Sequence, residues 1–395
     1  MINSQHLDLE LELQSYPEMP DTLLLPAHIA AFLLGVILVL GTCASAIRTF
    51  VLPRSVRDSI TNAVFRFSRK AFDVLSWWAK TYEQRDSVMA LFAPITLMVL
   101  PILWLILVMF GYMSIYWAMG TQSLSDALMA SGSSLLTLGF VRMDSTGLTL
   151  LSFSEAAVGL ILIALLIAYL PTMYAAFARR ESAVTLLEVR AGSPPSAIEL
   201  FARYTRLKRL DKLNDLWAQW ETVFADLEES HTSLAALAFF RSPQSHRSWV
   251  TAAGAVLDSA ALAVTTIDIP HDVQADLTIR AGYIALRRIA DAFGIKYEEH
   301  PDPADPISIS RIEFDAACAA LAEQNVALKA DRDTAWRGFA GWRVNYDTVL
   351  LRLCAITMAP YAPWSSDRSI LPKRRAKHFK KKDRVEIAQK NQAGN

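Results

Sequence analysis

Three long apolar runs, almost free of charge, constrain this 395-residue chain more than any other feature. They extend over 23–47, 87–120 and 147–178, and their only Asp, Glu, Lys or Arg is Glu155. A helix needs roughly 20 apolar residues to cross about 30 Å of hydrocarbon. We therefore predict three transmembrane helices, since three such lengths are unusual inside one soluble domain.

The distribution of basic residues predicts the direction of these helices. The N-terminal segment 1–22 has no Lys or Arg, and the segment between the second and third runs has Arg142 as its single basic residue. The segment between the first and second runs and the segment after the third run both contain several Lys and Arg residues. Because basic residues favour the cytoplasmic side, we expect the N-terminus outside and the C-terminal half in the cytoplasm. The protein is thus predicted to be a multi-pass protein of the plasma membrane, in bacteria the inner membrane. The acidic N-terminus lacks the basic region of a signal peptide, so the first run is expected to be retained.

The linker 53–86 between the first two spans has the pattern of an amphipathic helix. Apolar residues recur every three to five positions from Val56 to Trp78, with basic residues between them. Such a helix lies flat at the inner headgroup layer. Packing against the cytoplasmic domain is the alternative.

The segment 119–146, between the second and third spans, has the chemistry of a re-entrant pore loop. Residues 123–136 suit a short helix with Ser123 or Ser125 as its N-cap. Thr137-Leu138-Gly139-Phe140 then offers a hydroxyl, a flexible glycine and an aromatic residue. Backbone carbonyls at such a turn can replace the hydration shell of a cation. An ordinary extracellular hairpin is the alternative.

Over about residues 53–180, these features resemble the two-transmembrane pore-loop potassium channels. Ser133 and Ser134 match the end of a pore helix, Thr137 to Phe140 match the start of the filter, and Gly159 matches a hinge glycine. The resemblance implies conduction of monovalent cations, potassium above all, through a homotetramer. It departs where Val141 and Arg142 replace the second filter glycine and Asp144 comes late, which leaves selectivity for potassium over sodium open. The single-glycine loop also resembles that of Trk-type transporters, but their four repeats are missing here.

Glu155 is the other candidate within the membrane, because an acid in a span is costly and usually faces a cavity or a partner. It could attract cations, brace the loop, or reach the outer headgroups. With Ser133, Ser134, Asp144 and Gly159, it completes the predicted support of the pore.

The C-terminal half, 190–365, is predicted to be an all-α domain with helices near 196–210, 213–230, 248–264, 273–294, 310–325 and 331–358. It contains no nucleotide-binding glycine loop, zinc motif or nucleophile elbow, so we expect no enzymatic activity and no cofactor. The 228–231 segment, which ends at His231, is expected to be a solvated helix end rather than a metal site. Four arginines could form an anion pocket, although pairing with surface acids is expected instead: Arg241, Arg280, Arg287 and Arg288.

The tail 366–395 is predicted to be disordered and strongly basic. Near the inner leaflet, its basic residues would attract anionic lipid by about 1 kcal/mol each. Nucleic acid is not an expected partner. The lipid-binding residues that we predict are Lys373, Arg374, Arg375, Lys380, Lys381 and Lys382.

The sequence as a whole predicts an all-α protein with a three-span membrane domain, a re-entrant pore-like loop and a cytoplasmic helical domain. The function that it favours is a potassium-channel-like cation channel subunit, whose cytoplasmic domain regulates or assembles the pore. A non-conducting, membrane-anchored interaction module is the alternative.

Overall fold

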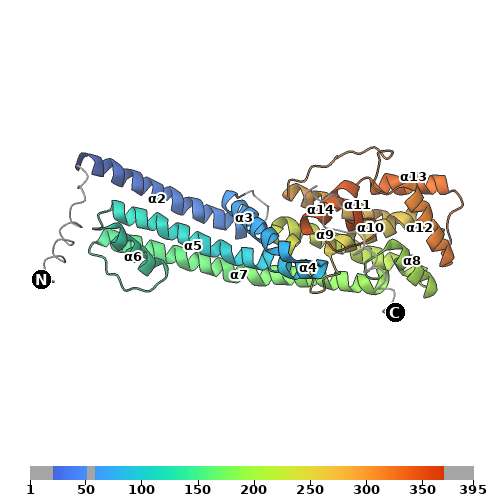
Figure 1. Ribbon diagram of the computed structural model, residues 1–395, viewed down its shortest axis with the longest axis horizontal. Helices are drawn as coiled ribbons and strands as arrows, with labels where there is room; N and C mark the ends of the chain where they lie inside the picture. The colour runs from blue at the N-terminus through green and yellow to red at the C-terminus, as the bar shows by residue number, and fades with distance from the viewer. Residues whose placement is uncertain (1–20, 51–57, 369–395) are drawn as a thin grey trace. The chain divides into compact units, whose positions relative to one another are not determined.

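The computed structural model describes residues 21–50 and 58–368, and this part of the protein is helical, with no β-strand. Its contacts form two compact units, whose helices are labelled in Figure 1. Among the described residues, the first unit comprises 21–50, 58–65 and 97–170, and the second comprises 66–96 and 171–368. The predicted residues of the basic tail, Lys373 to Lys382, lie outside the described part.

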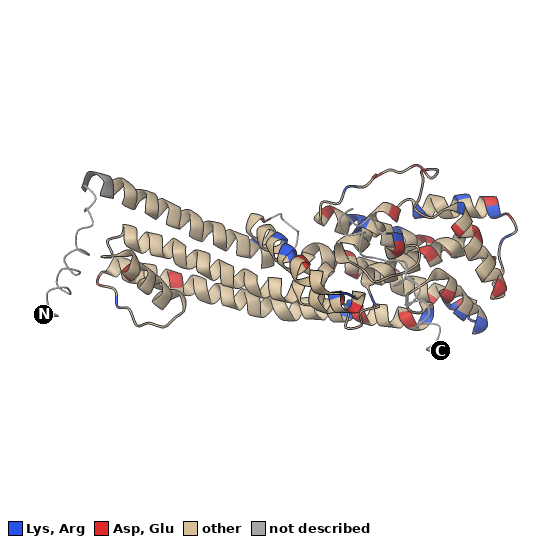
Figure 2. Ribbon diagram, in the orientation of Figure 1, with Lys and Arg blue, Asp and Glu red and all other residues tan. Residues whose placement is uncertain are grey.

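Within the described residues, three helical segments are long and apolar enough to cross a membrane, and each overlaps one of the three apolar runs: Leu25–Phe50, Tyr82–Ala118 and Thr146–Ala191. Figure 2 shows α2, α5 and the first part of α7 nearly free of charged residues, whereas α8 to α14 carry both signs. The all-α class and the three apolar helices are therefore confirmed. The helices between Asp21 and Ala191 are α2 (Asp21–Phe50), α3 (Ser59–Leu75), α4 (Tyr82–Ala90), α5 (Phe92–Ala118), α6 (Leu124–Leu135) and α7 (Thr146–Ala191).

The core of the first unit is built around Trp104, a fully buried residue of α5. Its indole N–H donates to the Ser45 hydroxyl of α2 at 3.1 Å, and this hydroxyl donates to the Asp58 carboxylate at 2.7 Å. Asp58 also accepts the backbone N–H of Thr61 at 2.8 Å, in the first turn of α3. A chain of hydrogen bonds thus fixes α2 and the start of α3 against α5, and it satisfies polar groups that would be costly to bury alone.

Two predicted boundaries differ from the observed helices. The third helix does not end with its apolar run at Ala178 but continues to Ala191, because charged side chains are as compatible with a helix as apolar ones. The predicted 53–86 helix is divided: α3 is followed by a 3₁₀ turn, Ser76–Trp78, and by α4, which Thr81 caps by accepting the N–H of Gln84.

The second unit packs its helices around α10 (Trp249–Thr265), which is buried along almost its whole length. A helix that is apolar on every face belongs in the centre of a bundle. The surrounding helices are α8 (Ala197–Arg206), α9 (Leu213–Ser233), α11 (Val273–Ala292), α12 (Arg311–Glu323), α13 (Arg332–Arg343) and α14 (Asp347–Thr357).

One charge, Asp258, lies on α10, and it is neutralised inside the core by Arg343. Arg343 is fully buried and also donates to Asp347 at 2.7 Å, while the hydroxyl of Tyr346 donates to Asp258 at 2.9 Å. Burial alone would lower the pKa of Arg343, but the two carboxylates outweigh this and raise its pKa above the ordinary value. Arg343 therefore stays charged and joins α10, α13 and α14.

This network also explains why the helix predicted over 331–358 is in fact two helices. The Asn345 side chain turns back and donates to the carbonyls of Gly341 and Trp342, which ends α13. The bend brings Tyr346 to Asp258 and Asp347 to Arg343.

The expectation of a solvated helix end at His231 is wrong. His231 is fully buried, packs against Trp249 in a tilted arrangement with ring centroids 4.5 Å apart, and lies 3.4 Å from the Arg180 guanidinium of α7. Burial and this neighbouring positive charge lower the pKa of His231 well below its ordinary value. Arg180 also donates to the carbonyls of Leu237 and Phe240 at 2.8 Å, so it attaches the end of α7 to the bundle.

We predict that Arg343→Met destabilises the second unit strongly, because it leaves two carboxylates buried without a counter-charge. Removing one partner of a buried pair costs about 3–5 kcal/mol, which lowers a thermal midpoint by roughly 10 °C in a domain of this size. Arg311→Met is the matched control, since Arg311 pairs with Asp315 and Asp333 at the surface, where solvent screening leaves an ion pair little effect on stability. Equal midpoints for the two variants in detergent solution would contradict the role of Arg343.

Candidate functional site

The short helix α6 lies between two of the long apolar helices in sequence and is itself too short to span a membrane. Its 12 residues rise about 18 Å in all, against about 30 Å of hydrocarbon. Ser123 is its N-cap, as predicted, and accepts the N–H of Asp126 at 3.1 Å. The buried side of α6 consists mainly of small residues, which allow a close approach to its neighbours: Ala127, Ala130, Ser131, Ser133, Ser134 and Leu135.

Serine side chains connect α6 to the helices on both sides of it. Ser131 donates to the Glu155 carboxyl of α7 at 2.5 Å and also lies 3.0 Å from the Met109 carbonyl of α5. The Ser134 hydroxyl shares a hydrogen bond of 2.8 Å with Ser152 of α7. These contacts hold α6 against α5 and α7 through hydrogen bonds as well as apolar packing.

Glu155 is completely buried among these helices. Ser131 donates to its Oε1 atom, and the buried hydroxyl of Tyr116 lies near its carboxyl group. A buried carboxyl group is costly unless polar neighbours compensate it. The contacts of Glu155 are those of a brace between α7 and α6.

Gly159, one turn further along α7, lies where the end of α6 comes closest. A Cβ atom at Gly159 would be 2.6 Å from the carbonyl oxygen of Leu135. No real Cβ tolerates that distance to backbone, so the sequence needs glycine here for close packing. Hinge motion, which motivated the prediction of Gly159, is not needed to explain this residue.

The loop after α6 is held through the N–H groups of three successive residues, Thr137, Leu138 and Gly139. The N–H of Thr137 donates to the Ser134 carbonyl at 3.0 Å, and those of Leu138 and Gly139 donate to the Ser133 carbonyl. Within the described residues, no hydrogen bond ends on the carbonyls of Thr137 to Phe140. This loop therefore presents four backbone oxygens without protein partners.

The same loop contains a strained backbone position. Thr137 has φ of +56° and Gly139 has φ of +69°. A left-handed conformation is costly for a β-branched residue such as threonine, and strain of this kind is characteristic of functional sites. A Cβ atom added at Gly139 would meet open space, so only the backbone angle demands glycine there.

The structure brings most of the predicted site residues together. Ser133 and Ser134 hold the loop through their carbonyls, and the Ser133 hydroxyl also accepts the N–H of Val141 at 3.1 Å. Leu138 and Phe140 are 63% and 57% exposed, so their side chains point away from the unit. Asp144 is exposed in the following loop, apart from the buried cluster.

Sequence reasoning missed Ser131, Tyr112, Tyr116 and Ser152 as members of this cluster. The signal was present in their spacing, because three successive segments each carry polar residues three or four positions apart, on one face of a helix. These pairs are Tyr112 with Tyr116, Ser131 with Ser134, and Ser152 with Glu155.

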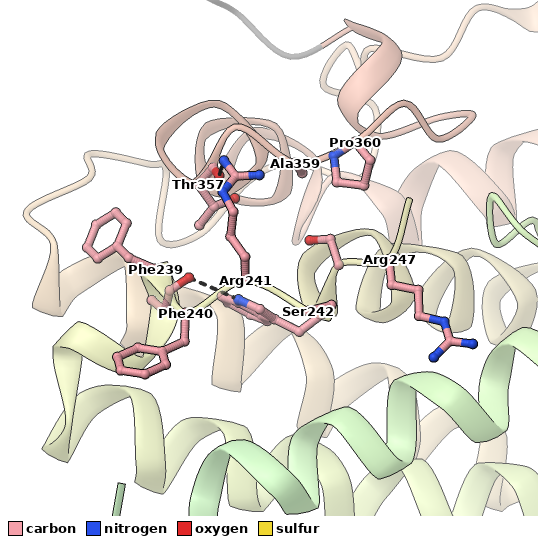
Figure 3. A pocket seen from close by; sticks show the side chains of 11 residues that line it. Phe239, Phe240, Arg241, Ser242, Arg247, Thr357, Ala359 and Pro360 are labelled. Atoms are coloured by element: carbon pink, nitrogen blue, oxygen red, sulfur yellow. Dashed lines mark hydrogen bonds between the residues drawn. The ribbon is translucent and has the colours of Figure 1, made fainter. Parts of the chain in front are cut away.

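The second unit has a small hollow, shown in Figure 3. Its volume is about 280 Å³, including the open solvent at its mouth. Arg241, on its wall, pairs with Asp86 and donates to the Thr357 carbonyl at 2.8 Å, so it is already occupied. Arg287 donates to the Asn345 carbonyl, and Arg288 pairs with the acid Glu228, as expected of a surface arginine.

Compared with protein-family models, curated proteins and solved structures, the chain matches none of them.

We predict that Gly159→Ala destabilises the first unit, because the added methyl collides with the Leu135 carbonyl. Gly132→Ala is the matched control, since a Cβ there meets open space and both glycines lie inside helices. Both substitutions gain the same helix propensity. The difference between their free energies of unfolding therefore measures the collision, which we expect to cost about 1–3 kcal/mol. The measurement is the thermal midpoint in detergent, and an unchanged midpoint for Gly159→Ala would refute the close approach.

Proposed function

We propose that the chain is one subunit of a potassium-like cation channel, in which α6 and the Thr137–Phe140 loop of several copies line the ion pathway. The observation that carries this proposal is the set of four loop carbonyls without protein partners. Non-helical backbone at membrane depth is tolerated only where protein buries it or where it lines a water-filled cavity. Carbonyl oxygens of this kind are suitable ligands for a dehydrated monovalent cation.

The surroundings of the loop support the same proposal. The C-terminal end of α6 leads into the loop, and the negative end of a helix dipole attracts cations. The Ser131–Glu155 contact and the glycine at 159 hold α6 in a fixed position, as an ion-coordinating turn requires. A single loop cannot surround an ion, so the proposal includes assembly, with four copies as the expected number.

The direction of the chain in the membrane follows from its charges. With the Lys and Arg residues between α2 and α5 and after Ala178 on the cytoplasmic side, the loop opens to the outside. The second unit then lies in the cytoplasm, where it regulates or assembles the pore.

The proposal predicts that purified protein in liposomes conducts potassium or rubidium and that Gly139→Val reduces this flux about tenfold. The reason is that valine at a positive φ costs at least about 1–2 kcal/mol, and 1.4 kcal/mol is a factor of ten. The matched control is Gly120→Val: Gly120 also has a positive φ, +102°, and open space around it, but it precedes α6. Its flux should stay close to wild type.

Two results would contradict the proposal. Liposomes of the wild-type protein that are impermeable to all monovalent cations under applied voltage would favour a non-conducting interaction module. Equal losses in the two glycine variants would mean that strain anywhere in the hairpin matters and that the loop is not the pathway.

A further inference from the structure

The segment from Arg66 to Lys80, in the second unit, has two faces of different character. One face is packed: the Phe72 ring lies 5.8 Å from the ring of Phe92, and Arg69 donates to the Ile356 carbonyl of α14 at 3.2 Å. Ser76 is buried on the same side. The alternative of a helix that packs on the C-terminal domain therefore describes this face.

The opposite face exposes large apolar side chains. Trp77 and Trp78 are 74% and 83% exposed, and the three others recur at helical spacing on the same side of α3: Phe67, Val74 and Leu75. Isolated apolar residues at a surface are ordinary, but a contiguous patch that includes two tryptophans indicates a binding surface.

The charge and composition of this face indicate its partner. Lys70 lies between Phe67 and Val74, Lys80 follows the tryptophans, and both are exposed. Asp73 is held by Arg69 at 3.3 Å on the packed side. Tryptophan is enriched at the headgroup level of bilayers, and lysines beside it attract anionic lipids.

The connection along the chain places this face near a bilayer. Trp78 precedes α4 by only three residues, and α4 begins the second helix segment that is apolar enough to cross a membrane, Tyr82–Ala118. A helix of α4's 9 residues is only about 14 Å long. The two tryptophans therefore lie close, along the chain, to the start of a helix that is apolar enough to cross a membrane.

We propose that the face made by Phe67, Val74, Leu75, Trp77 and Trp78, with Lys70 and Lys80, inserts into the headgroup layer of an anionic lipid bilayer. One side of the segment then holds the second unit, and the other holds lipid. The proposal does not depend on conduction, because an impermeable membrane module would attach in the same way.

The test uses the full chain with Cys43, Cys318 and Cys354 replaced by alanine and one new cysteine, Trp78→Cys, labelled with a polarity-sensitive fluorophore. The protein is reconstituted in phosphatidylglycerol-containing liposomes with lipids that carry a spin label near the headgroup. We expect the label to be quenched several-fold more than one at Ile312→Cys, since Ile312 is 81% exposed but lies on α12. Phe67→Cys provides a second position on the same face, should the first variant fold poorly.

Equal quenching at the two sites would overturn the proposal. So would protection from a water-soluble quencher without lipid quenching, since this result would mean that protein covers the face. Quenching that is unchanged in pure phosphatidylcholine would overturn the assignment to anionic lipid.

Discussion

The hydrogen bond between Ser131 and Glu155 holds the short helix α6 against the long helix α7. The other features of the candidate site depend on it. With α6 in place, the Leu135 carbonyl passes within contact of Gly159, and the carbonyls of Ser133 and Ser134 receive the N–H groups of the loop. Within the described residues, the carbonyls of Thr137 to Phe140 accept no hydrogen bond. A buried carboxyl group is an expensive anchor in apolar surroundings, and its presence is understandable if the exact position of α6 matters.

A second set of contacts links α3 and α4 to the C-terminal part of the second unit. The end of α14 and the residue after it leave three successive carbonyls without helical partners. Each carbonyl accepts a hydrogen bond from a different side chain. Arg69 of α3 donates to Ile356, and Tyr82 of α4 donates to Met358. Arg241, which precedes α10, donates to Thr357. The helix end, with its negative partial charge, is thereby neutralised by two arginines. Any rearrangement of α14 would change the contacts of α3 and α4.

The sequence was sufficient for the helices whose patterns are local. The three apolar runs, the Ser123 cap and the buried α10 could all be recognised from composition and spacing. The break between α13 and α14 could not, because it depends on Asn345 capping and on a buried charge that lies 85 residues away in sequence. Likewise, Glu155 was recognisable as an unusual acid, but its partner Ser131 was not, since nothing local relates two residues 24 positions apart.

The central claim is that the bare carbonyls of Thr137 to Phe140 face a shared ion pathway. Electron cryomicroscopy of the full chain in lipid nanodiscs tests it most directly. We expect four copies around one axis, with these oxygens turned toward it and density for a cation between them. A single copy, or an assembly in which this loop lies at the periphery, would contradict the account.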